Sequence, residues 1–425
     1  NPETRTVMVE VQVTDVSRQA LANRSEVLVH PADVYAGLRF ADGIGVAETP
    51  TTVEFVTVTP EGESVDGVAV DFTVVRRTWD SIRQKDMDGM WAWVNTINDV
   101  EVTTEQRRSS RDAASFEWTP PEGGYYVVKA SVRDDQGRTS VTERALYVTG
   151  AGATWARSDG NHLSLVPDKR RYTPGETATI LVKAPRPGLS ALVTVEREGV
   201  LSREVVTLES TADTIEIPIT EDAVPNLFVS VVAVEGAPPS DSPEGTIPNW
   251  YMGYVPLEVD PNGRRLAVDV KTDLSTYQPG QTVKATVNVS RGDEAVGDAH
   301  VVLYAVDYGV LSLTNYGTPD AFSTYYAKHP LRVKTADNRT RVLNRGAFLA
   351  KGGDVGGGGG DGGSGTRSRF VTTPLWMPNL TTGKNGSVEV EFELPDNLTT
   401  FKLMAVVDSG ADGYGSGSNE LKVAK

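Results

Sequence analysis

The sequence predicts an all-β chain built from tandem antiparallel β-sandwiches. Three observations lead to this prediction: apolar residues alternate in many short runs, clusters of Gly, Pro, Asp and Asn separate the runs, and the same motifs recur along the chain. Many short strands with turn signals at regular intervals are typical of sandwiches. We find no convincing amphipathic pattern longer than about three helical turns.

The alternating runs are the first of these observations. Representative runs cover residues 52–58, 125–132 and 179–183. Successive side chains of a strand point to opposite faces, so alternation indicates one buried face and one solvated face. These runs therefore predict half-buried strands.

The recurrence of motifs is the third of these observations. Tyr172-Thr173-Pro174-Gly175 recurs 105 residues later as Tyr277-Gln278-Pro279-Gly280, each copy lying between two strand patterns. Pro fixes φ and Gly tolerates positive φ, which is the chemistry of turns. The motif therefore predicts a hairpin or corner, and its recurrence predicts tandem copies of one fold.

The repeat divides the chain into four parts. Residues 1–36 are expected to be the closing strands of a truncated sandwich, because the chain opens inside a strand pattern without Met. Full sandwiches are expected over residues 37–150, 157–260 and 262–425. The last one exceeds the repeat by about 60 residues, which predicts an insertion at about 314–370.

Composition excludes several classes of protein. The net charge of −16 argues against nucleic acid and against anionic membrane surfaces as partners. The chain has no cysteine, so it cannot form a disulfide, a thiolate nucleophile or a cysteine-ligated zinc site, which fits a bacterial exported protein. No apolar stretch reaches the roughly 18 residues that a membrane-spanning helix needs.

The expected insertion contains a glycine-rich segment. Glycine loses the most backbone entropy on ordering, so such a run predicts a flexible coil. The glycines that define the segment are Gly352, Gly353, Gly356, Gly357, Gly358, Gly359 and Gly360. A long loop without secondary structure inside a compact domain is normally functional or a linker.

The insertion is basic although the chain is acidic. Residues 328–369 hold nine basic and three acidic residues. Exposed mobile segments are where proteolysis concentrates, and mixed basic and apolar residues suit several peptidases. The candidate cleavage sites are Lys328, Arg332, Lys334, Arg339, Arg341, Arg345, Phe348, Lys351, Arg367 and Arg369. On composition alone, an inert insertion tethered by charge to the acidic body remains an alternative.

Three motifs after the insertion carry a family resemblance. They are Thr373-Pro374-Leu375-Trp376-Met377-Pro378-Asn379-Leu380, Asn385-Gly386-Ser387-Val388-Glu389-Val390-Glu391-Phe392 and Leu394-Pro395-Asp396-Asn397-Leu398-Thr399-Thr400-Phe401. Together they resemble the segment that follows the bait in alpha-2-macroglobulins. Residues 165–175 and 193–199 resemble the bacterial branch of that family. The resemblance covers essentially the whole chain.

The resemblance implies a fold and a mechanism. It implies macroglobulin-like sandwiches of the fibronectin or immunoglobulin type, with a bait inserted in the third one. In the family, endopeptidases cut the bait and the body rearranges around them. Implied partners are these proteases and the neighbouring macroglobulin-like and thioester-type domains of a full-length parent. The thioester motif needs a cysteine that this chain lacks. Export to the periplasm or cell surface, including as a lipid-anchored protein, is also implied.

Other motifs predict no catalytic, metal or cofactor site. His30, His162, His300 and His329 have neither metal-ligand spacing nor a nucleophile motif nearby. Residues 86–89 hint at a calcium loop but lack the further ligands. We therefore expect a protein that is not an enzyme and needs no cofactor.

The resulting hypothesis is a part of a broad-spectrum protease inhibitor that presents a cleavable bait loop and traps the protease by conformational change. The alternative is a structural or adhesive cell-surface array in which the glycine segment is an inert spacer. A third hypothesis is glycan binding by the module that carries Trp79, Trp91, Trp93 and Trp118, because carbohydrate-binding sandwiches use exposed aromatic residues.

Overall fold

A computed structural model of the protein describes residues 4–85, 89–158, 160–236, 249–336, 371–410 and 412–424. The described chain consists mainly of antiparallel strands, which confirms the predicted fold class. It forms two compact units. The first contains most of the chain up to Leu257, and the second most of the chain from Glu258 onward.

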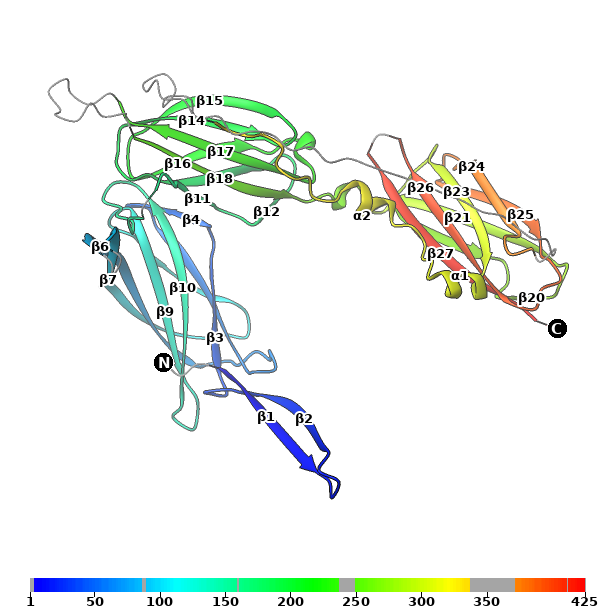
Figure 1. Ribbon diagram of the computed structural model, residues 1–425, viewed down its shortest axis with the longest axis horizontal. Coiled ribbons are helices and arrows are strands. Elements are labelled where there is room, and N and C mark those ends of the chain that lie inside the picture. The colour runs from blue at the N-terminus through cyan, green and yellow to red at the C-terminus, as the bar shows by residue number, and fades with distance from the viewer. Residues whose placement is uncertain are drawn as a thin grey trace. The chain divides into compact units, whose positions relative to one another are not determined.

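The first complete sandwich consists of two facing sheets (Figure 1). The smaller sheet contains β3 (Tyr35–Phe40), β5 (Thr51–Val58) and β8 (Ala114–Trp118). The larger contains, in spatial order, β4 (Ile44–Val46), β10 (Thr139–Thr149), β9 (Gly124–Arg133), β6 (Ala69–Lys85) and β7 (Trp91–Arg108). Aromatic side chains from both sheets fill the core between them, among them Phe55, Phe72, Phe116, Trp118 and Tyr126.

The second sandwich repeats this plan. Its smaller sheet contains β11 (Ser164–Pro167), β13 (Thr177–Lys183) and β16 (Ala212–Pro218). Its larger sheet contains β12 (Arg171–Tyr172), β18 (Trp250–Val259), β17 (Asn226–Val234), β14 (Leu189–Glu196) and β15 (Val200–Leu208).

The third sandwich follows the same order. One sheet contains β19 (Ala267–Thr272), β21 (Thr282–Arg291), β22 (Glu294–Ala295) and β25 (Ser387–Glu393). The other contains β20 (Thr276–Tyr277), β27 (Tyr414–Val423), β26 (Thr400–Asp408), β23 (His300–Asp307) and β24 (Leu375–Thr381). All three larger sheets therefore share one strand order, as tandem copies of one fold would. The exact domain boundaries stay a prediction.

The repeated Tyr-x-Pro-Gly motif forms a corner with a specific hydrogen-bond pattern. The Tyr172 hydroxyl donates to the Asp168 carboxylate at 2.7 Å, and the Tyr277 hydroxyl donates to the Asp273 carboxylate at 2.6 Å. Both tyrosines are about 1% exposed. Burial, followed by the hydrogen bond to the aspartate, raises the pKa of each tyrosine. The motif is thus a structural corner, as its turn chemistry predicts.

An N-terminal hairpin precedes the first sandwich. It consists of β1 (Arg5–Thr14) and β2 (Ala20–Val29), paired from Arg5 with Val29 to Thr14 with Ala20. Every residue of both strands is exposed. A lone two-stranded hairpin is marginally stable in water. Its interpretation as part of a truncated sandwich stays a prediction.

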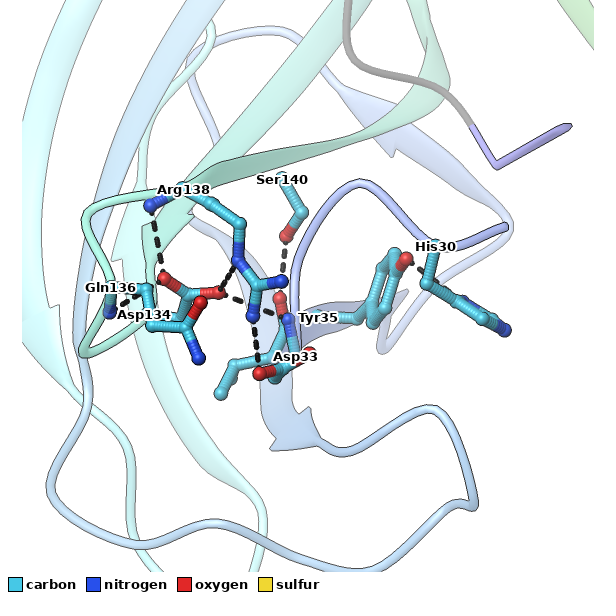
Figure 2. Close-up of polar contacts among 8 residues, drawn as sticks. His30, Asp33, Tyr35, Asp134, Gln136, Arg138 and Ser140 are labelled. Carbon is cyan, nitrogen blue, oxygen red and sulfur yellow. Dashed lines mark hydrogen bonds and ion pairs between the residues drawn. The ribbon is translucent and has the colours of Figure 1, made fainter. Parts of the chain in front are cut away.

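A polar network fixes the segment that joins this hairpin to the first sandwich (Figure 2). The Asp134 carboxylate accepts hydrogen bonds from the Asp33 N–H at 3.1 Å and from the Arg138 guanidinium at 2.8 Å. It also accepts the N–H groups of Gln136 and Arg138. The Arg138 guanidinium pairs with Asp33 as well. The Asp134 side chain is 3% exposed, so it depends on these donors for its charge.

The first and second sandwiches meet through apolar and aromatic contacts. Ile44 packs with Leu181 and Ala212. The Lys183 ammonium lies 5.3 Å from the ring centroid of Tyr147 and 4.9 Å from that of Trp155. Burial lowers the pKa of Lys183. A half-buried lysine held by two aromatic faces thus belongs to this junction.

Replacing Tyr277 with Phe should remove the hydroxyl partner of Asp273 while keeping the ring. We expect the free energy of unfolding to fall by about 1 kcal/mol, the usual contribution of one hydrogen bond. Urea denaturation measures the change, with the half-exposed Tyr308 as the matched Tyr→Phe control. An equal effect of the two substitutions would contradict a stabilising role for the hydrogen bond between Tyr277 and Asp273.

Acid should weaken the Asp134 network. Burial acts to raise the pKa of Asp134, but the hydrogen bonds from Asp33, Arg138 and Gln136 outweigh it and lower this pKa below 3.8. A carboxylate with a lowered folded pKa stabilises the fold above its ordinary pKa and loses that effect as pH falls through the lowered value. Asp134→Asn should therefore flatten the acid side of the melting-temperature profile. Asp135→Asn, an exposed neighbour, should leave the profile unchanged.

Candidate functional site

The expected insertion lies between two neighbouring strands of one sheet. β23 pairs with β24 in antiparallel register, from His300 with Thr381 to Ala305 with Leu375. In the second sandwich the equivalent pair, β14 and β15, is joined by residues 197–199 alone. In the third sandwich residues 308–374 make the same connection. The insertion therefore replaces a hairpin turn, and both of its ends are anchored in one sheet.

The insertion begins with a short helix that packs on the sheet. Helix α1 (Tyr308–Thr314) starts at Asp307, whose carboxylate accepts the Gly309 N–H at 2.8 Å. It ends at Asn315, which has a left-handed φ of 51°. Asn tolerates this conformation better than most residues and so can end a helix. Leu311 is buried against Tyr304 and Met404, which attaches α1 to β23 and β26.

A second helix is held by an aromatic cluster. Helix α2 (Ala321–Tyr325) places Phe322 at 4% exposure, with the Arg265 guanidinium 3.9 Å from the ring centroid. Tyr325 stacks on Tyr414 at 4.4 Å with an interplanar angle of 20°. The Tyr326 hydroxyl donates to the Asp412 carbonyl at 2.6 Å. Residues 314–326 were expected to lie in the flexible insertion, but this part is folded onto the sandwich.

Beyond α2 the chain continues as an extended segment, residues 328–334, which we call the strap. Its side chains alternate: Lys328, Arg332 and Lys334 are exposed, whereas Leu331 and Val333 are half-buried. Such alternation is the pattern of a strand lying on a surface. The strap is therefore a docked segment whose basic side chains face solvent.

Three contacts hold the backbone and the first side chain of the strap. The Asn226 amide group donates to the His329 carbonyl at 3.0 Å, and its oxygen accepts the His329 N–H at 2.8 Å. The Arg332 N–H donates to the Arg197 carbonyl at 2.9 Å. The Lys328 ammonium pairs with Glu258.

The described residues include only the first three of the ten expected cleavage sites. Lys328, Arg332 and Lys334 lie in the strap. The remaining candidates lie outside the described residues: Arg339, Arg341, Arg345, Phe348, Lys351, Arg367 and Arg369. The glycines of the expected flexible segment, Gly352, Gly353 and Gly356 to Gly360, also lie outside them.

Comparison with known proteins places this insertion in a family context. The alpha-2-macroglobulin bait region domain matches residues 163–313, and the alpha-2-macroglobulin family model matches residues 373–425. An alpha-2-macroglobulin homolog of a Nostoc species is 28% identical over 425 residues, covering 98% of this chain and 22% of the relative. The chain belongs to the alpha-2-macroglobulin family. The two matches leave residues 314–372 between them, which is most of the insertion at residues 308–374.

Two further alpha-2-macroglobulins are similar to this chain. The Xylella fastidiosa protein is 27% identical over 399 residues, covering 89% of this chain and 23% of its own length. A solved Salmonella alpha-2-macroglobulin mutant aligns with 99% of this chain and 27% of that one, at 19% identity and a TM-score of 0.40. The chain spans between a fifth and a quarter of the length of the curated relatives named here.

The strap contacts were not foreseen from the sequence. Asn226 lies 103 residues before His329, and nothing in its own strand pattern marks it as a partner of the insertion. One available signal was the position of Asn226 as a polar residue at the start of an apolar strand, where a side chain 3% exposed needs hydrogen-bond partners. The aromatic cluster around Phe322 had no sequence signal that we can identify.

The four tryptophans of the first sandwich have packing roles for the most part. Trp118 is in the core, 6% exposed, and Trp79 contacts Tyr125 at 5.7 Å between ring centroids. Arg83 and Arg157 lie over the Trp93 ring. Only Trp91, 56% exposed with Lys85 over its ring, offers an aromatic surface of any size among these four. This arrangement provides little support for the glycan-binding hypothesis.

The described residues offer neither a metal-binding cluster nor a membrane-spanning helix. Within the described ranges, no group of three or more His, Cys, Asp or Glu side chains could hold a metal ion. The hint of a calcium loop at residues 86–89 falls mostly outside those ranges. None of the helices in the described part of the chain has the length and apolar character required to cross a bilayer.

Truncating Phe322 tests whether the start of the insertion is folded. Phe322→Ala should lower the free energy of unfolding of the unit that contains the third sandwich by about 3 kcal/mol, as expected for a buried aromatic side chain. Leu313→Ala, at an 89% exposed position, should change it by less than about 0.5 kcal/mol. Urea unfolding measures both variants. Similar small effects would show that α2 does not pack as described.

Proposed function

We propose that this chain presents a protease bait and forms part of a broad-spectrum protease inhibitor. The observation that carries the proposal is the insertion of residues 308–374 between the paired strands β23 and β24. Family membership supports the proposal, because a bait region domain model matches residues 163–313 and so extends into the start of this insertion.

The position of the insertion suits a bait. A cut between β23 and β24 leaves both strands in the sheet, since β23 still pairs with β26 and with β24 itself. Leu375 and Phe401 remain in the core of the third sandwich. Cleavage therefore removes a covalent constraint without unfolding the domain that carries it. Release of such a constraint is a recognised way to switch between two arrangements.

The expected cleavage sites belong to this proposal. Basic and apolar residues between Lys328 and Arg369 would serve proteases of several specificities, and the glycine segment would give them access. The attacking endopeptidase would then be trapped by rearrangement of the body. The inhibitor would act without catalysis or a cofactor of its own.

The family context extends to partners and location. Neighbouring macroglobulin-like and thioester-type domains of a longer parent protein are the proposed intramolecular partners. Residues 1–425 contain no cysteine, so any thioester would have to come from such a domain. We place the protein outside the cytoplasm, in the periplasm or on the cell surface, including as a lipid-anchored form.

A spacer in an adhesive array is the competing function. It predicts that ligand binding by the array is indifferent to nicking of the insertion. The bait function predicts that several unrelated proteases choose the insertion and that the cut chain changes its hydrodynamic size.

Limited proteolysis separates these functions. Trypsin-like, chymotrypsin-like, elastase-like and subtilisin-like enzymes at low ratio should all make their first cuts between Lys328 and Arg369, with both flanking sandwiches intact. Mass spectrometry maps the cuts, and analytical gel filtration detects rearrangement.

A matched variant sharpens that experiment. Replacing Arg339, Arg341 and Arg345 with Gln should slow trypsin-like cutting several-fold and leave elastase-like cutting unchanged. First cuts outside the insertion, or resistance of the insertion to all four enzymes, would contradict the bait function and favour the spacer.

A further inference from the structure

The Asn226 side chain makes a two-point contact with a segment far away in the sequence. It donates to the His329 carbonyl at 3.0 Å and accepts the His329 N–H at 2.8 Å. Both groups that it engages are backbone groups. An amide that donates to a C=O and accepts from an N–H of the same residue replaces the partner strand that an extended segment would otherwise have.

We infer that Asn226 is a positioning residue for the bait: it pins the strap and thereby sets the N-terminal limit of the stretch that proteases can cut. This inference rests on the proposed bait function and adds to it a residue that determines where cleavage starts. The peptide bonds after Lys328 and Arg332 are therefore expected to resist cleavage, although both residues are basic and exposed.

Burial makes Asn226 a fixed anchor. It is the first residue of β17 and is 3% exposed. Buried polar groups need hydrogen-bond partners, so the two bonds to His329 favour a docked strap. The neighbouring residues Ala223 and Leu227 are also buried, which restricts movement of this end of the strand.

A second backbone contact supports the first. The Arg332 N–H donates to the Arg197 carbonyl at 2.9 Å, three residues beyond the Asn226 contact. Between the two contacts, Leu331 is half-buried. The strap is therefore held at two backbone points and by its apolar face.

In the strap, a side chain can be exposed while the peptide bond that follows it is not accessible to a protease. Lys328, Arg332 and Lys334 are exposed, so exposure alone would predict rapid tryptic cutting at all three. A protease must bind an extended backbone over several residues, which requires the strap to lift from its two contacts first. The rate of cleavage then depends on the small fraction of molecules in which the strap has lifted.

Asn226→Ala tests the inference directly. The variant removes both hydrogen bonds to His329, so the rate of trypsin cutting after Lys328 and Arg332 should rise about tenfold. The control is Asn249→Ala, which removes the amide that bonds Glu235 at the other end of the β17–β18 pair and does not touch the strap. Mass spectrometry of timed digests gives the rate at each bond.

A second pair of variants keeps the test valid if Asn226→Ala does not fold. Arg332→Pro removes the N–H that bonds Arg197, whereas Arg332→Ala keeps it. Neither change touches a buried residue of the second sandwich. Cutting after Lys328 and Lys334 should accelerate several-fold in Arg332→Pro and stay at the wild-type rate in Arg332→Ala.

Two results would overturn the inference. One is a wild-type chain that is cut after Lys328 or Arg332 as fast as a free peptide of residues 326–336. The other is a folded Asn226→Ala or Arg332→Pro variant with unchanged cutting rates. Both results are cleavage rates at single bonds in the strap, so they test the inference without testing the bait function. The bait function fails only if cuts outside the insertion predominate or no rearrangement follows.

Discussion

The antiparallel pairing of β23 with β24 is the constraint on which the functional region depends. It fixes both ends of a long insertion in adjacent strands of one sheet, from His300 with Thr381 to Ala305 with Leu375. Loop-closure entropy grows slowly with length, so a hairpin can tolerate such an insertion if its strands are stable. Their stability comes from the core of the third sandwich, where Leu303, Leu375 and Phe401 are buried.

The described start of the insertion combines folded and extended parts in a definite order. Helices α1 and α2 return the chain to the sandwich through Leu311 and Phe322. The strap then follows, with backbone contacts at His329 and Arg332. Seven of the ten expected cleavage sites follow the strap in the sequence, so a cut at any of them leaves the N-terminal side attached to the folded part of the chain.

Sequence patterns predicted the repeating architecture because its causes are local. Alternation over residues 52–58 and 179–183 appears as β5 and β13, and the two Tyr-x-Pro-Gly motifs appear as equivalent corners. The recurrence of one motif at 105 residues was sufficient to predict tandem sandwiches. The family resemblance of the segment around residues 394–401 was confirmed by the matching family models.

The candidate site was only partly predictable, because its contacts are long-range. Composition located the basic, glycine-rich stretch, but residues 314–326 carry no strong helical period and still fold through Arg265, Tyr414 and Asp412, which are distant in sequence. Exposed basic residues in the strap looked equivalent to those further on. The strap is held by Asn226 and Arg197, and neither residue has a sequence pattern that points to the strap.

Hydrogen exchange of the intact chain, resolved to single amides by fragmentation, tests this account most directly. The His329 and Arg332 amides each donate a hydrogen bond in the strap. Both amides should exchange much more slowly than in a free peptide of residues 326–336. Asn226→Ala should restore fast exchange at His329 while the amides of β23 and β26 stay protected. Exchange of His329 and Arg332 at free-peptide rates in the wild-type chain would contradict it.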